Sequence, residues 1–231
     1  MNSIGRLTVF ALLFLNSCSD MSDNYFPFKE GKTWSYSINL FSSYTGKEYK
    51  KRIFIKNIKT QKQNRGFELI RLHSNGNYYK YFLENGSKKL SRISVLIKNG
   101  QGLTEPINKV IYPDILFRKE KWTSMEQLFL TKGYQPPLLN FKPETIFEMN
   151  YALKKKINKF RHRGKLFKNC FYIIGYGSTS FIADTRSGPL NVKVESEEWI
   201  CENIGMVKEK RSENTEASAF GKTTMTKELV F

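Results

Sequence analysis

Histidine and cysteine are scarce in this chain of 231 residues, which has two histidines and three cysteines. His73 and His162 lie far apart in the sequence, and neither sits at metal-ligand spacing from cysteines or carboxylate pairs. We interpret both as exposed strand or turn residues. The sequence also lacks G-x-S-x-G, H-E-x-x-H, S-x-x-K and Walker motifs, so it predicts no enzyme, no metal and no cofactor.

Long hydrophobic runs are absent too, because the one apolar run covers only residues 7–15. A membrane-spanning helix needs about 20 apolar residues, which excludes a multispanning membrane protein. Acidic residues are outnumbered, with 21 Asp and Glu against 38 Lys and Arg, for a formal net charge of +17. Aromatic residues reach 14%, which is too much apolar surface for a disordered chain.

The first residues are typical of an export signal. Residues 1–6 form a short positive region, and the nine-residue apolar run follows it. The four residues LNSC that end at Cys18 resemble the bacterial lipobox, in which the cysteine becomes the lipid-bearing first residue of the mature protein. Ser19 then implies, by the same resemblance, transfer to the outer membrane. The alternative is an ordinary secretory signal cleaved elsewhere, with Cys18 as a plain thiol.

These features divide the chain into a lipoprotein signal peptide at 1–17, a lipidated tether at 18–24 and a single domain at 25–231. The remaining cysteines are Cys170 and Cys201. Outside the inner membrane the environment is oxidising, so an even pair suggests a disulfide. The alternative is two buried free thiols, because the sequence alone does not define their geometry.

Alternating apolar and polar residues dominate the rest of the chain, as in Trp34–Leu40. Asn-Gly pairs at residues 75–76, 85–86 and 99–100 predict turns between strands. In 145–161 helix and strand periodicity compete, and we favour a strand. The expected strands are 34–40, 48–58, 66–72, 78–83, 89–97, 121–130, 145–161, 166–174, 190–201, 206–210 and 222–231.

This pattern predicts an all-β fold, with at most a short helix: one strongly curved antiparallel sheet of about ten strands, as a half-barrel or open barrel. A weak internal repeat relates Tyr25–Trp34 to Tyr112–Trp122, since each has Tyr and Pro before a turn and Trp opening a strand. It marks either two halves of the sheet or a chance similarity.

Three stretches together resemble a broad set of bacterial envelope proteins: Tyr25–Tyr36 (YFPFKEGKTWSY), Gly164–Cys170 (GKLFKNC) and Trp199–Lys208 (WICENIGMVK). The resemblance implies a lipoprotein or periplasmic protein whose fold is similar to the half-barrel of lipoprotein-localisation carriers. It implies no catalytic residues. Physically, Gly31 supplies a positive φ before the first strand, Trp34 and Tyr36 share a strand face, and Gly205 permits a turn or bulge.

Two other motifs favour structural roles. Gly175-Tyr176-Gly177 resembles a turn at the end of a strand rather than a phosphate loop, because no lysine or helix follows it. Glu195, Glu197 and Glu198 cluster in one strand region, where period two would pair the first two as carboxylates. We favour a solvated sheet face for this acidic cluster.

Positive charge is concentrated in residues 154–168, which hold eight cations and no acid. They are Lys154, Lys155, Lys156, Lys159, Arg161, Arg163, Lys165 and Lys168. One interpretation is an exposed sheet edge kept soluble by lysine. A second is contact with anionic lipid headgroups or lipopolysaccharide phosphate. Nucleic acid is the least favoured partner, because the export signal removes the chain from it.

The sequence therefore predicts a bacterial envelope lipoprotein, anchored through its N-terminal lipid and most consistent with the outer membrane. Our first hypothesis is a binding or scaffold module for a lipid, a hydrophobic molecule or an envelope protein. The second is a structural subunit of an envelope complex with no small ligand. An unrecognised hydrolase is the least favoured.

Overall fold

The computed structural model describes residues 25–96, 103–104, 109–115, 117–128, 146–182, 188–217 and 220–231. The predicted signal peptide, Cys18, the tether and the Asn-Gly turn at 99–100 lie outside these residues. Within the described ranges all regular structure is strand, and no helix is long and apolar enough to span a bilayer.

One antiparallel sheet of thirteen strands forms the fold, which confirms the predicted all-β class. The strands are β1 (Thr33–Ser42), β2 (Glu48–Gln63), β3 (Gly66–His73), β4 (Tyr78–Glu84), β5 (Leu90–Leu96), β6 (Leu103–Thr104), β7 (Lys109–Tyr112), β8 (Lys121–Gln127), β9 (Ile146–His162), β10 (Lys165–Ile182), β11 (Pro189–Cys201), β12 (Gly205–Thr215) and β13 (Lys222–Val230). The strands beyond those expected are β6 and β7, which are too short to show alternation in the sequence.

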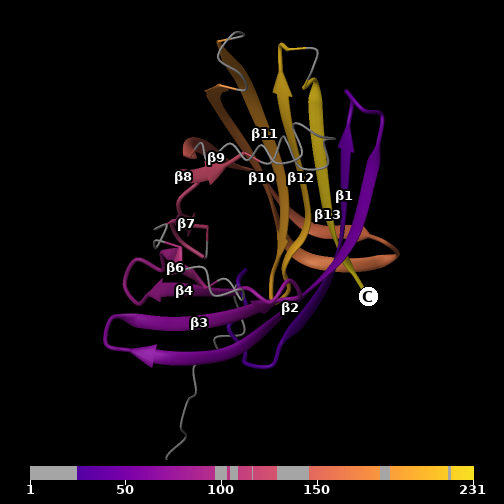
Figure 1. Ribbon diagram of the computed structural model, residues 1–231. Helices are drawn as coiled ribbons and strands as arrows, with labels where there is room; N and C mark the ends of the chain where they lie inside the picture. The colour runs from indigo at the N-terminus through magenta and orange to yellow at the C-terminus, as the bar shows by residue number, and fades with distance from the viewer. Residues whose placement is uncertain are drawn as a thin grey trace, which may run out of the picture.

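The sheet consists of two meanders, β1–β7 and β8–β13, in which strands pair with near neighbours in the sequence. Pairing of β1 with β13 joins the two meanders, and Figure 1 shows the strands curling into a nearly closed barrel. On the opposite side of the barrel, β7 and β8 are connected through side chains. Ser124 Oγ donates to the Val110 carbonyl at 2.6 Å, and Lys109 forms an ion pair with Glu126. The predicted half-barrel or open barrel is therefore confirmed.

The two repeated segments occupy equivalent places in this architecture. Trp34 is the second residue of β1 and Trp122 the second residue of β8, so each opens the first strand of a meander. Their leading segments also meet, since the Tyr112 and Tyr25 rings both contact Phe117, at 5.0 and 5.4 Å between centroids. This placement agrees with the interpretation of two halves.

The entry to β1 follows the prediction from its sequence. Gly31 has a φ of 77°, and Trp34 and Tyr36 are both buried on one face of the strand. Trp34 Nε1 donates to the Ile204 carbonyl at 2.8 Å, and the Tyr36 hydroxyl donates to the Met206 carbonyl at 2.9 Å. These bonds hold β1 beside the β11–β12 turn, where Gly205 has a φ of 88°.

The prediction of a turn at Gly175–Gly177 is wrong, because both glycines lie inside β10. They are paired across the sheet with Tyr151 and Met149 of β9. A Cβ on Gly175 would lie 2.6 Å from Tyr151 Cε1, and one on Gly177 would lie 2.4 Å from Met149 Sδ. Glycine therefore leaves room for large side chains of the neighbouring strand.

Two apolar clusters form the core. The larger fills the barrel with aromatic rings, among them Trp122 and Tyr151, which stack at 5.4 Å. The smaller packs around Cys170 and Cys201, which face each other across β10 and β11 and are joined by a disulfide. The disulfide that the sequence left open is thus present in the structure.

Candidate functional site

Inside the barrel lie two adjoining cavities of about 150 Å³ each, which share Ile111, Tyr112 and Met206 in their walls. The first is lined mainly by rings and by basic groups, whereas the second contains acids and bases together. No residue of either wall was predicted as a site residue from the sequence.

Aromatic side chains and three nitrogen-bearing groups line the first cavity. The rings belong to Phe26, Trp34, Tyr36, Tyr81 and Tyr112, and the nitrogen groups to Arg71, His73 and Lys227. Its lining includes no Asp or Glu. The first cavity is therefore apolar on its walls and basic in its polar groups.

Arg71 is held in place by neutral partners. Its Nε donates to Asn57 Oδ1 at 2.8 Å, and its Nη2 donates to the Pro27 carbonyl at 3.1 Å. The guanidinium carbon lies 3.7 Å from the Phe26 ring centre and 4.8 Å from that of Trp34. Such stacking suits a planar, weakly hydrated cation, and it fixes the orientation of the side chain.

His73 was predicted to be exposed, and that prediction is wrong, because its ring lines the first cavity and packs 4.1 Å from the Tyr79 ring. Burial, followed by the charges of Lys227, Arg71 and Arg92, lowers the pKa of His73 to about 3. The imidazole is thus neutral at physiological pH. The three cations that contribute to this shift place positive charge near His73.

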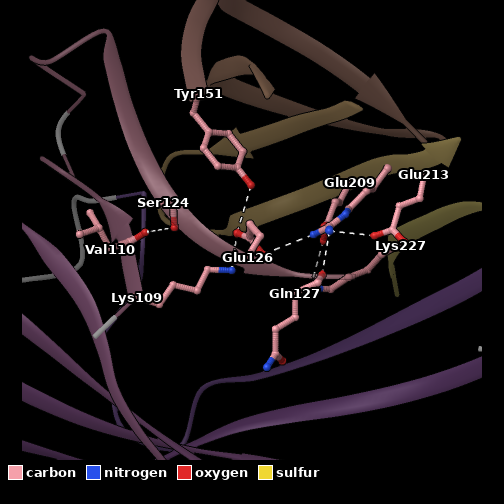
Figure 2. A network of polar contacts seen from close by, with 10 residues as sticks. Lys109, Val110, Ser124, Glu126, Gln127, Tyr151, Glu209, Glu213 and Lys227 are labelled. Atoms are coloured by element: carbon pink, nitrogen blue, oxygen red, sulfur yellow. Dashed lines mark hydrogen bonds and ion pairs between the residues drawn. The ribbon is translucent and has the colours of Figure 1, made fainter. Parts of the chain in front are cut away.

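The second cavity contains a network of buried ion pairs centred on Arg211 and Glu126 (Figure 2). Arg211 Nη1 lies 3.3 Å from Glu126 Oε2, and Arg211 Nη2 lies 2.8 Å from Glu213 Oε1. Glu126 also pairs with Lys109 and accepts a bond from the Tyr151 hydroxyl at 3.1 Å. Burial alone would raise the pKa of Glu126, but Lys109 and Arg211 outweigh it and hold that pKa below its ordinary value.

Glu198 differs from these paired acids. It lies directly across the sheet from Glu209, so two carboxyl groups occupy neighbouring positions on the inner face. Burial, and then the charges of Glu209 and Glu126, raise the pKa of Glu198 to about 8. The expected solvated face is therefore wrong for Glu198, while Glu195, at the other parity, is exposed.

Replacing Glu198 by glutamine should change how stability depends on pH. The folded carboxyl keeps its proton up to about pH 8, whereas the unfolded one loses it near its ordinary pKa of 4.5. The folded wild type must therefore retain that proton at increasing cost as pH rises. When the pH is raised from 5 to 7, the free energy of unfolding of Glu198→Gln should therefore increase relative to that of wild type by on the order of 2 kcal/mol.

Urea unfolding at the two pH values measures this gain. Glu195→Gln serves as the matched control, because it removes an exposed carboxyl from the same strand and should leave the pH dependence unchanged. Identical pH profiles for Glu198→Gln and wild type would contradict the shift. His73 has the opposite effect: because its pKa is lowered in the folded state, it makes the protein more stable as the pH rises from about 3 to 6.5. Wild type and variant both contain His73, so this effect cancels when they are compared.

The structure places the predicted basic residues together on one hairpin. We call residues 154–168, at the connection of β9 and β10, the basic hairpin; all eight of its cations are exposed. Its end folds back toward β13, where Arg163 Nη2 lies 2.8 Å from Glu228 Oε2. Lys165 Nζ lies 3.5 Å from the Phe231 ring centre. The other cations stay available to an external surface.

His162, at the end of β9, is also less exposed than predicted. Only 9% of the residue is accessible, and its ring stacks with that of Phe160 at 6.0 Å. Its position supports packing of the hairpin rather than ligand binding. Within the described ranges, no group of three His, Cys, Asp or Glu side chains is placed to hold a metal ion.

Comparisons with known proteins give only distant similarities. No family model and no curated protein matches the chain. Among solved structures, it is similar to a candidate lipoprotein from Parabacteroides distasonis ATCC 8503, with a TM-score of 0.40 and 13% identity over 90% of this chain and 99% of that one. A second is a candidate exported protein with a YmcC-like fold from Bacteroides fragilis NCTC 9343, with a TM-score of 0.40 and 10% identity over 90% of this chain and 100% of that one. At this level of similarity neither neighbour carries a conclusion about function.

Proposed function

We propose that the chain is a lipid-anchored bacterial envelope protein in which the barrel is a small-ligand binding module held at an anionic membrane surface. Cys18 carries the lipid, and Ser19 favours the outer membrane. The proposed role is binding rather than catalysis, because Glu126 and Glu213, two of the acids inside the barrel, are engaged in ion pairs.

The position of Tyr25 relative to the basic hairpin carries this proposal. The Tyr25 ring packs 4.4 Å from that of Phe171, which is paired across the sheet with Lys156. Tyr25 follows Cys18 by seven positions, and a chain of that length reaches at most roughly 25 Å. A lipid on Cys18 would thus keep the membrane within reach of the hairpin's cations.

The size of the interior favours a small ligand over an acyl chain. Sites for drug-sized ligands have volumes of roughly 300–1,000 Å³, whereas each cavity here has about 150 Å³. Charged groups in both walls add a cost to burying a long apolar chain beside them. The hypothesis of a lipid inside the barrel is therefore less favoured than a compact polar ligand.

Removing charge from the hairpin should weaken membrane binding. The test uses a lipid-free form, residues 19–231, which is exported behind a cleavable secretory leader. In this form Lys154, Lys155 and Lys156 are replaced by glutamine. Each cation near an anionic surface contributes about 1 kcal/mol, so three losses should weaken binding roughly a hundredfold. Sedimentation with phosphatidylglycerol-containing vesicles at low salt measures the change.

The matched control replaces Lys50, Lys51 and Arg52, the other run of three exposed cations, on β2. Equal weakening by both triple variants would mean that net charge alone drives binding, which contradicts the proposed orientation. Intact-mass measurement of the membrane-extracted wild type tests the anchor separately, and an unmodified Cys18 would contradict it.

A further inference from the structure

Arg71 stands apart from the other arginine that lies deep in the barrel, Arg211, because no carboxylate of the described residues pairs with it. Its hydrogen-bond partners are an amide oxygen and a backbone carbonyl. Arg211, by contrast, pairs with Glu126 and Glu213. A guanidinium away from bulk water is costly unless its charge is compensated. The first cavity therefore contains a positive charge that the described part of the chain leaves uncompensated.

Donors remain on this guanidinium for a ligand. Arginine has five N–H groups, and Arg71 uses one on Nε and one on Nη2 in the bonds described above. The others lie on Nη1 and Nη2, which together form the edge that binds carboxylates in a bidentate manner. Arg71 lines the first cavity, so a ligand there would lie next to this guanidinium.

The other polar groups of the first cavity do not oppose an anion. Lys227 adds positive charge, offset in part by Glu209, whose Oε2 lies 3.7 Å from its Nζ. His73 is neutral and offers a hydrogen bond. The Tyr36 hydroxyl already donates to the Met206 carbonyl. The polar face of the cavity is thus basic and fixed by its own contacts.

The size and walls of the cavity define the rest of the ligand. About 150 Å³ is the volume of a cavity that can hold a benzene-sized molecule. The rings of Phe26, Trp34, Tyr81 and Tyr112 offer flat apolar surfaces to such a body. We propose that the first cavity binds a small organic anion, a flat ring bearing one carboxylate, whose oxygens accept hydrogen bonds from Arg71 Nη1 and Nη2.

This inference rests on the proposed binding role, but it is tested without membranes, so its failure is distinguishable from failure of the membrane contact. The protein as the cell exports it, purified in a mild detergent, is titrated with benzoate in a calorimeter. Arg71→Lys, which keeps the charge but loses the planar fork, should bind benzoate about tenfold to a hundredfold more weakly. Arg92→Lys changes a cation outside the lining of this cavity and should bind normally.

A second measurement remains informative if Arg71→Lys folds poorly. In ¹⁵N-tryptophan wild type, benzoate should shift the indole signal of Trp34, which lines the cavity, and leave that of Trp199 in place. Benzyl alcohol tests the ring without the carboxylate, and inorganic phosphate tests an anion without the ring. Both should bind more weakly than benzoate. The proposal is overturned if benzoate does not bind, if either probe equals it, or if Arg71→Lys binds it as well as wild type does.

Discussion

Arg211→Met should destabilise the protein by about 3–5 kcal/mol, the usual cost of removing one partner from a buried ion pair. Glu213 has no accessible surface and lies 2.8 Å from the Arg211 guanidinium. Without Arg211, this buried carboxylate would lose the guanidinium with which it pairs. Glu126 would keep its ion pair with Lys109, so most of the lost stability should come from Glu213.

Chemical denaturation of the variants measures this loss. Arg211→Met combined with Glu213→Gln should recover much of the stability, because the second change removes the buried charge with which Arg211 pairs. Lys210→Met, an exposed neighbour on β12, is the control and should change stability by less than about 0.5 kcal/mol. A single variant as stable as this control would show that the network contributes little.

Removal of the disulfide is the second large effect. Cys170 and Cys201 are separated by 31 residues, and closing a loop of that length stabilises the folded state by roughly 3–4 kcal/mol in the chain-entropy model. Cys170→Ala with Cys201→Ala should lower the free energy of unfolding by that amount. Urea unfolding without reductant gives the value.

Reductant provides the matching control for this pair. Wild type in excess dithiothreitol should approach the stability of the double variant, and the double variant should not respond to dithiothreitol. A wild type that is equally stable with and without reductant would contradict a stabilising role. Since both cysteines pack in the smaller core cluster, part of the loss will come from lost contacts.

Local signals account for the parts of the fold that the sequence predicted correctly. Alternation and Asn-Gly turns located β3, β4 and β5, whose connections contain Gly76 and Gly86. Trp34 and Tyr36 were assigned correctly to one face because residues two positions apart in a strand point to the same face. Such features depend only on neighbours in the sequence.

Which side chains point into the barrel depends instead on non-local features of the strand pairing. Register shifts interrupt the pairing at Asn57–Lys59, Lys80–Tyr81 and Trp199–Ile200, and the alternation of the sequence does not show where such shifts fall. Both faces of β3 also carry apolar residues, so the sequence does not reveal that Arg71 faces the barrel. The signal available was a charged residue between two apolar ones, Ile70 and Leu72, and it does not specify a face.

The same pairing of β1 with β13 that completes the barrel also sets the order in which the chain can fold. The other pairings join strands near each other in the sequence, but Ser35 meets Val230 at the far end of the chain. Bringing such distant segments together costs about 2–3 kcal/mol more entropy than closing a ten-residue hairpin. Until β13 arrives, β1 and β12 each have an unpaired edge, which is where strands associate wrongly. β13 therefore protects the edges of β1 and β12 at once.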